Sequence, residues 1–135
     1  MKILFICKAN VGRSQMAEAI FSKLTQNHET FSAGVNPEKW EGKKLSETEF
    51  VKICLSEIGL DVNEKVSKKL TEEMVTNADK IVTIVEEELW PGFLKESDKV
   101  IKWDIADPGD EDLEFHRMTR DKIKSLVISL IKSLP

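Results

Sequence analysis

The sequence predicts an α/β fold of three layers, in which a four-stranded parallel sheet carries helices on both faces. Two observations support this prediction. Short runs of apolar and β-branched residues alternate with segments of helical periodicity, the order that produces parallel strands joined by crossover helices. The 135 residues contain no linker-like or repetitive segment, so we expect one domain over residues 1–135, with enough apolar residues for a core.

The first half of this pattern is a strand, a helix and a second strand. Residues 2–7 form a continuous apolar run, typical of a strand buried on both faces. Residues 14–25 change to helical spacing, and a short strand over residues 29–32 ends near Gly34. The apolar stripe of the predicted helix consists of Met16, Ile20 and Leu24.

Two helices are expected in the middle of the chain. The first spans residues 46–58, where Ser46 and Glu49 form a capping-box pattern. The second spans residues 71–77, with Thr71 as its N-cap.

Two further strands and a long helix complete the predicted fold. Residues 80–85 are rich in β-branched residues, and residues 99–103 form the fourth strand. Apolar residues from Ile123 to Leu134 recur with the period of a helix. Because parallel sheets bind ligands at the carboxyl ends of their strands, the end of the first strand, at Cys7, is the candidate site.

Composition excludes several functions. Lysine and arginine number 20 against 24 acidic residues, a formal charge of −4, which disfavours nucleic-acid and anionic-membrane partners. No apolar run reaches the roughly 20 residues of a membrane helix, and the N-terminal run is too short for a signal peptide. With only two cysteines, we expect a cytoplasmic protein with reduced thiols. His28 and His116 lack ligand partners and are expected to face solvent or cap a helix, so no metal or cofactor is predicted.

The loop between the first strand and the first helix has the composition of an anion site. It reads Cys-Lys-Ala-Asn-Val-Gly-Arg-Ser over residues 7–14. A tight loop that opens into a helix directs backbone N–H groups at one small volume, and Arg13 adds a planar fork for a tetrahedral oxyanion. The residues expected to bind phosphate are Lys8, Ala9, Asn10, Val11, Gly12, Arg13 and Ser14.

The backbone N–H groups of this loop and the positive charge of Arg13 also favour the thiolate form of Cys7. The thiolate is the nucleophilic form. Ser14 is expected to donate a hydrogen bond to that sulfur, Asn10 to hold the loop and tolerate a left-handed φ, and Gly12 to allow close backbone approach. The alternative is that Cys7 is only a small core residue. The chain contains neither of the glycine-rich nucleotide-binding motifs.

Residues 5–18 resemble the phosphate loop of the low-molecular-weight protein tyrosine phosphatase family, which includes the thioredoxin-coupled arsenate reductases. Residues 13–18 look closer to the reductase branch. Residues 32–34 and 70–83 resemble further parts of the family pattern. The resemblance implies a phosphotyrosine protein phosphatase I-like fold and a cysteine-dependent phosphatase that hydrolyses phosphomonoesters through a phospho-cysteine intermediate.

The family places its general acid in an Asp-Pro dipeptide, and the one such dipeptide here is Asp107-Pro108. Pro108 restricts the backbone of Asp107, and a positioned acid assists departure of the leaving group. The resemblance therefore makes Asp107 a catalytic residue together with Cys7 and Arg13. Asp104 is the second candidate for the acid, and a simple turn before the last helix is the alternative role for the dipeptide.

The chain departs from the tyrosine phosphatases after this dipeptide. Gly109 and Asp110 stand where those proteins carry aromatic residues, and the sequence has no tyrosine. Phosphotyrosine is therefore one possible substrate among phosphorylated proteins and small molecules. Trp40 resembles the aromatic wall residue of the loop after the second strand, and an exposed tryptophan with a structural role is the alternative.

The thioredoxin-coupled reductases require two more cysteines near the third strand, and residues 85–91 contain none. Cys54 has the spacing of a helix core position. Two alternatives to the phosphatase remain: an arsenate reductase that uses Cys7 with an external thiol, and a non-catalytic module that binds phospho-ligands. Phosphate and arsenate are both expected ligands, and the sequence makes no prediction of oligomeric state.

Overall fold

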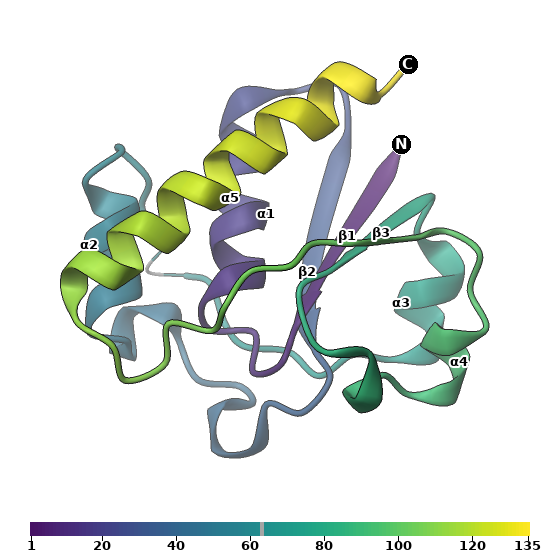
Figure 1. The fold of residues 1–135 in the computed structure, drawn as a ribbon, viewed down its shortest axis with the longest axis horizontal. Helices are drawn as coiled ribbons and strands as arrows, with labels where there is room; N and C mark the ends of the chain where they lie inside the picture. The colour runs from purple at the N-terminus through teal and green to yellow at the C-terminus, as the bar shows by residue number, and fades with distance from the viewer. Residues whose placement is uncertain (63) are drawn as a thin grey trace.

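Four parallel strands form one sheet in the computed structural model, which describes residues 1–62 and 64–135 (Figure 1). The strands are β1 (Lys2–Cys7), β2 (Glu29–Gly34), β3 (Lys80–Thr83) and β4 (Val100–Lys102). Their order across the sheet is β2-β1-β3-β4, and every pairing is parallel. The predicted α/β fold is confirmed.

Helices cover both faces of this sheet (Figure 1). One face is covered by α1 (Arg13–Leu24), α2 (Phe50–Ser56) and α5 (Leu113–Ser133), and the other by α3 (Glu72–Asn77) and α4 (Gly92–Lys95). Short 3₁₀ helices are η1 (Glu38–Trp40), η2 (Leu45–Glu47) and η3 (Glu87–Leu89). No helix in the described ranges combines the length and apolar character needed to cross a membrane.

The continuous apolar run of β1 follows from its place between two cores. Ile3 and Phe5 lie in the core beneath α1 and α5, whereas Leu4 and Ile6 lie in the core beneath α3 and α4. Successive side chains of a strand point to opposite faces of the sheet. A central strand covered on both sides must therefore be apolar at every position.

The helix predicted over residues 46–58 begins later, at Phe50. Thr48 has extended backbone (ψ 149°), and its hydroxyl donates to the carbonyl of Leu45 at 2.6 Å, which ends η2 before α2 starts. The predicted Ser46–Glu49 capping box is wrong, because the backbone N–H of Lys44 instead donates to the carboxylate of Glu47 at 3.0 Å. A side chain that satisfies a nearby backbone group competes with helix formation at such boundaries.

The other helix starts agree better with the sequence. Thr71 caps α3, since its hydroxyl accepts a hydrogen bond from the backbone of Met74 at 3.3 Å. Asp112 caps α5 by accepting from the backbone of Phe115 at 2.9 Å. Each cap satisfies a backbone donor that has no partner within the helix.

A cluster of charged side chains joins α5 to Glu57, at the end of α2. The carboxylate of Glu57 accepts hydrogen bonds from Arg117 at 2.5 and 3.1 Å and from Arg120 at 2.6 Å. The hydrogen bonds from Arg117, and then those from Arg120, lower the pKa of Glu57 to about 2. The cluster thus favours the folded state only while Glu57 is ionised.

We expect the folded protein to lose part of its stability between about pH 4.5 and pH 2. The pKa of Glu57 is depressed on folding, so its stabilising effect is complete above the unfolded pKa of about 4.3 and disappears as the pH falls toward about 2. Glu57→Gln should therefore lower the Tm at pH 7 and reduce the change in Tm across this pH range. Glu88→Gln, at an exposed position, is the matched control. Parallel Tm–pH curves for wild type and Glu57→Gln would contradict the prediction.

Candidate active site

The carboxyl ends of the four strands surround the loop that follows β1. Cys7 is the last residue of β1, and in the register of the sheet it lies opposite Gly34, the last residue of β2. The first turn of α1 begins at Arg13, directly after the loop. The loop therefore occupies the edge of the sheet at which ligands bind in open α/β folds.

Two hydrogen-bond donors point at the sulfur of Cys7. The thiol group is buried, with the residue 2% exposed, and its Sγ lies 2.9 Å from Oγ of Ser14 and 3.3 Å from the backbone nitrogen of Asn10. The side-chain amide of Asn10 donates to the same Ser14 oxygen at 2.8 Å. The hydroxyl hydrogen of Ser14 is thereby left for the sulfur, an arrangement that stabilises a thiolate.

Asn10 holds the loop in shape. Its φ is 59°, in the left-handed region that asparagine tolerates. Its Nδ2 also donates to the hydroxyl of Ser32 at 3.0 Å, and its Oδ1 accepts from the backbone of Lys68 at 2.9 Å and from Gln15 at 3.2 Å. Because the side chain is fully buried, each of these partners matters for its position.

The guanidinium of Arg13 is buried, with the residue 4% exposed, and is fixed by two strand ends. Its Nη1 donates to the carbonyl of Ile84, just after β3, at 2.6 Å and to that of Ile105, beyond β4, at 2.9 Å. Its Nη2 lies 3.5 Å from the carboxylate of Asp107. A guanidinium carries five N–H donors, so donors remain for an anion at the loop.

Asp107 lies at the site, and Asp104 does not. The side chain of Asp107 is 56% exposed, contacts Arg13, and accepts a hydrogen bond from the backbone of Gly109 at 3.0 Å. Asp104 is exposed and does not line the pocket; its backbone carbonyl accepts from Lys122 at 2.9 Å. The geometry therefore favours Asp107 over Asp104 as the candidate acid.

Gly34 packs directly beneath the loop, a role that the sequence analysis did not assign to it. A Cβ atom at this position would lie 2.6 Å from the carbonyl oxygen of Lys8 and 2.9 Å from the backbone nitrogen of Asn10. Contacts this short with backbone atoms require the loop itself to move. The residue is therefore needed for the close approach of β2 to the loop.

Gly34→Ala should displace the loop, weaken phosphate binding by about tenfold or more, and destabilise the fold by about 1–3 kcal/mol, the usual cost of overpacking. Competitive inhibition by inorganic phosphate and thermal unfolding would measure the two effects. Gly92→Ala is the matched control, because nothing lies within 4 Å of the added Cβ. Unchanged phosphate affinity in Gly34→Ala would show that the loop adapts to the methyl group.

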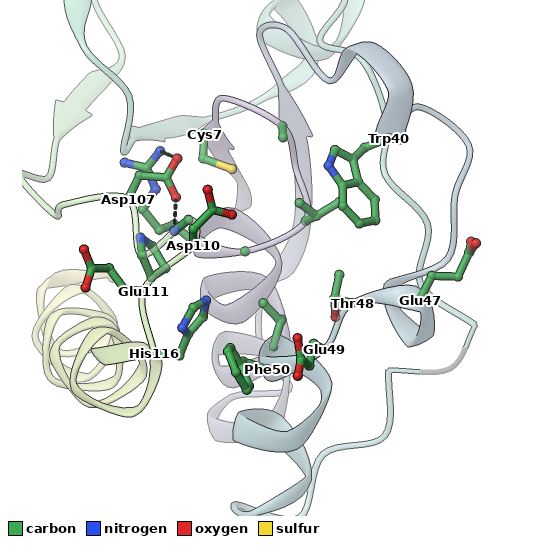
Figure 2. Close-up of a pocket in the computed structure, with 17 residues that line it drawn as sticks. Cys7, Trp40, Glu47, Thr48, Glu49, Phe50, Asp107, Asp110, Glu111 and His116 are labelled. Carbon is green, nitrogen blue, oxygen red and sulfur yellow. Dashed lines mark hydrogen bonds and ion pairs between the residues drawn. The ribbon is translucent and has the colours of Figure 1, made fainter. Parts of the chain in front are cut away.

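A pocket of about 520 Å³ opens beside Cys7 (Figure 2). The predicted loop residues that line it are Cys7, Ala9, Val11, Gly12 and Arg13. Lys8, Asn10 and Ser14 are not among the lining residues; Asn10 and Ser14 are buried and support the loop, and Lys8 is exposed. Trp40, in η1, lines the pocket as expected for a wall residue, and the amino group of Lys43 lies 5.7 Å from the centre of its ring.

Phe50 and His116 also line the pocket, and the sequence analysis missed both. Their ring centres are 5.1 Å apart, and Figure 2 shows them together at one edge of the pocket. The sequence analysis expected His116 either to face solvent or to cap a helix; the residue is 5% exposed, so the first of these alternatives is wrong. Its spacing of seven residues from the core residue Ile123 was the available signal, since both lie on one face of α5.

The described ranges contain no group of three or more metal-ligating side chains.

Comparison with known proteins decides the family. A sequence model of the low molecular weight phosphotyrosine protein phosphatases matches residues 2–135. The chain belongs to this family. The family resemblance inferred from the sequence is thereby confirmed.

Relatives within the low molecular weight phosphatase family carry different activities in their names. A protein-arginine-phosphatase of Bacillus subtilis is 30% identical over 99% of this chain and 97% of its own. An arsenate reductase of Brevibacillus brevis is 33% identical over 90% and 87%. A low molecular weight protein tyrosine phosphatase from T. tengcongensis has a TM-score of 0.84 at 28% identity, covering 99% of each chain.

Proposed function

We propose that this member of the family hydrolyses phosphomonoesters, with Cys7 as nucleophile, Arg13 as the principal phosphate ligand and Asp107 as general acid. The observation that carries the proposal is the convergence of these groups at one pocket. The hydroxyl of Ser14 and the backbone N–H of Asn10 lie within hydrogen-bond distance of the sulfur of Cys7. Nη2 of the buried Arg13 lies 3.5 Å from the carboxylate of Asp107. Nucleophile, anion ligand and acid therefore lie within reach of one phosphoryl group.

In the first step, the thiolate of Cys7 attacks phosphorus and forms an S–P bond as the bond to the leaving oxygen breaks. The carboxyl group of Asp107 gives its proton to that oxygen. The phosphoryl oxygens are bound by the backbone N–H groups of residues 8–13 and by the free N–H groups of Arg13. These donors are held in place before the reaction, which is how they stabilise charge in the transition state.

In the second step, water attacks the phosphorus of the phospho-cysteine, and the carboxylate of Asp107 accepts its proton. The S–P bond breaks, and the thiolate leaves with inorganic phosphate as the product. The hydroxyl of Ser14, 2.9 Å from the sulfur, stabilises the departing thiolate. The cycle needs a reduced Cys7, which agrees with the cytoplasmic location that we propose for the protein.

The substrates that we propose are phosphorylated proteins or small molecules, including phosphotyrosine. Trp40 would contact a flat leaving group. Arsenate reduction is the second candidate, because arsenate has the shape and charge of phosphate and fits the same loop. A relay of cysteines within the chain is not available for it, since the second of the two cysteines, Cys54, is 0% exposed and lies in the core beneath α2.

A paired assay on one preparation tests the proposal. We expect release of phosphate from p-nitrophenyl phosphate, and no arsenate-dependent oxidation of glutathione or thioredoxin beyond the background without protein. Cys54→Ala should behave as wild type in both assays, because the residue lies outside the pocket. Arsenate-dependent oxidation without phosphate release would support the reductase instead. Tight phosphate binding with no turnover in either assay would identify a binding module.

A further inference from the structure

One peptide unit of the loop, between Ala9 and Asn10, faces the sulfur of Cys7. The N–H of this peptide is that of Asn10, and its nitrogen lies 3.3 Å from Sγ. The carbonyl group of a planar trans peptide points away from its N–H group, so the carbonyl of Ala9 is directed away from the sulfur. The orientation of this peptide therefore decides whether a donor or an acceptor faces the nucleophile.

The observed orientation requires an unfavourable backbone conformation. Asn10 has a φ of 59°, in the left-handed region that most residues avoid. If the peptide turned over, φ of Asn10 would become negative and the carbonyl oxygen of Ala9 would face the sulfur. An oxygen with partial negative charge destabilises a nearby thiolate. The orientation that serves the nucleophile must therefore be held by contacts with neighbouring segments.

The hydroxyl of Ser67 provides such a contact. Its Oγ donates to the carbonyl oxygen of Ala9 at 2.7 Å, and no other group in the described part of the chain donates to that oxygen. Ser67 is 2% exposed and is not among the residues that line the pocket. The residue therefore acts on the loop and does not touch the substrate.

The main chain fixes the position of this hydroxyl. The N–H of Ser67 donates to the carbonyl of Lys43, and its carbonyl accepts from the N–H of Gly42, both at 2.9 Å. The next N–H along the chain, that of Lys68, donates to Oδ1 of Asn10 at 2.9 Å. Residues 67 and 68 thus hold the peptide at its carbonyl and at the side chain of Asn10.

We propose that Ser67 is a positioning residue for the nucleophile, whose hydroxyl fixes the Ala9–Asn10 peptide so that its N–H stabilises the thiolate of Cys7. The proposal rests on the phosphatase function proposed above, in which that thiolate attacks phosphorus. A hydrogen bond accepted by a peptide carbonyl also polarises the peptide and strengthens its N–H as a donor. Ser14 contacts the sulfur independently, so loss of the Ser67 hydroxyl should weaken the thiolate without abolishing it.

The test measures the thiolate directly, in a Cys54→Ala background in which Cys7 is the sole cysteine. Iodoacetamide alkylates the thiolate and not the thiol, so the alkylation rate across about pH 4 to 9 gives the midpoint of ionisation. We expect Ser67→Ala to move this midpoint upward by about half a pH unit or more, the effect of one lost hydrogen bond. The acid limb of kcat/KM for p-nitrophenyl phosphate should move by the same amount. Ser67→Thr keeps the hydroxyl and should restore both profiles.

Thr119→Ala is the matched control. Thr119 is 5% exposed, and its hydroxyl also donates to a backbone carbonyl, that of Phe115, at 2.9 Å. The residue lies outside the pocket lining. This variant should lower the Tm, as loss of a buried hydrogen bond does, and should leave the alkylation midpoint at its wild-type value.

Each outcome bears on one level of the proposal. An unchanged midpoint in Ser67→Ala, with phosphate still released, would overturn the positioning role and leave the phosphatase intact. An equal shift in Thr119→Ala would assign the effect to general destabilisation and would also overturn it. Absence of phosphate release from the wild-type protein would contradict the phosphatase, while the alkylation profiles would still decide the role of Ser67. If the added methyl group prevents Ser67→Thr from folding, the comparison of the two alanine variants is decisive.

Discussion

Cys7→Ser is expected to abolish hydrolysis of p-nitrophenyl phosphate, lowering kcat by on the order of 10⁴-fold or more. A serine hydroxyl at this position is not ionised at neutral pH, and it has no neighbouring base to remove its proton: the contacts to Sγ come from Ser14 and from the backbone of Asn10. The thiolate is the form of the group that attacks. The replacement therefore removes the proposed nucleophile and keeps a hydrogen-bond acceptor at its position.

The variant also separates chemistry from binding. Because serine is close to cysteine in size and accepts the same hydrogen bonds, Cys7→Ser should keep its fold and bind inorganic phosphate within about threefold of wild type. Calorimetric titration with phosphate, thermal unfolding and steady-state kinetics measure the three quantities on one preparation. Wild-type turnover in Cys7→Ser would remove Cys7 as the nucleophile. Loss of phosphate binding together with turnover would indicate a collapsed loop.

Asp107→Asn should show an effect that depends on the leaving group. Phenyl phosphate, whose leaving oxygen needs a proton, should react about 10²–10³-fold more slowly, whereas p-nitrophenyl phosphate should lose less than about tenfold. Asparagine keeps an oxygen that can accept from the backbone of Gly109, but it carries no acidic proton and no charge opposite Arg13. The steepness of log kcat/KM against leaving-group pKa should therefore increase.

Asp104→Asn is the matched control for this experiment. It removes the same charge from the same segment, at a residue outside the pocket lining. We expect rates within about twofold of wild type for both substrates. An equal loss on both substrates in Asp107→Asn would exclude Asp107 as the proton donor and leave it a role in positioning Arg13.

The layers of the fold were predictable because they follow from local patterns. The run from Lys2 to Cys7 is apolar at each interior position because β1 has a core on each side. The stripe through Ile123, Val127 and Leu130 is buried on one face of α5. Such periodicities result from burial itself, so they are present in the sequence before any tertiary contact is known.

The first turn of α2 was not predictable in the same way. Ser46 and Glu49 have the spacing of a capping box, yet the chain satisfies its backbone groups through Glu47 and Thr48 instead. Both solutions use short-range hydrogen bonds of similar strength. The choice between them depends on where Leu45 is buried in the core, which is a tertiary contact.

In the candidate site too, the residues linked by local sequence patterns were predictable, and those brought together by tertiary contacts were not. Cys7, Asn10, Arg13 and Ser14 were predicted because they share one loop. Asp107 was predicted because the family resemblance places the acid in an Asp-Pro dipeptide, which occurs once in the sequence. Phe50 and His116 escaped notice because α2 and α5 bring them together from 66 positions apart in the sequence. Gly34 was recognised only as the end of the second strand. Its packing role was missed because that role is the absence of a side chain, and only the position of the loop backbone shows why a Cβ atom would not fit.

The two carbonyl groups that hold Arg13 bear on how this site tolerates divergence. Ile84 and Ile105 contact the guanidinium through main-chain oxygens, which every amino acid possesses. Substitutions at these two positions change no partner of Arg13 as long as the side chains that replace them fill the same core. Residue-by-residue comparison of sequences therefore does not register this part of the site. Whether a related protein keeps these two contacts to Arg13 depends on the spacing between the ends of β3 and β4, which is a property of the whole sheet.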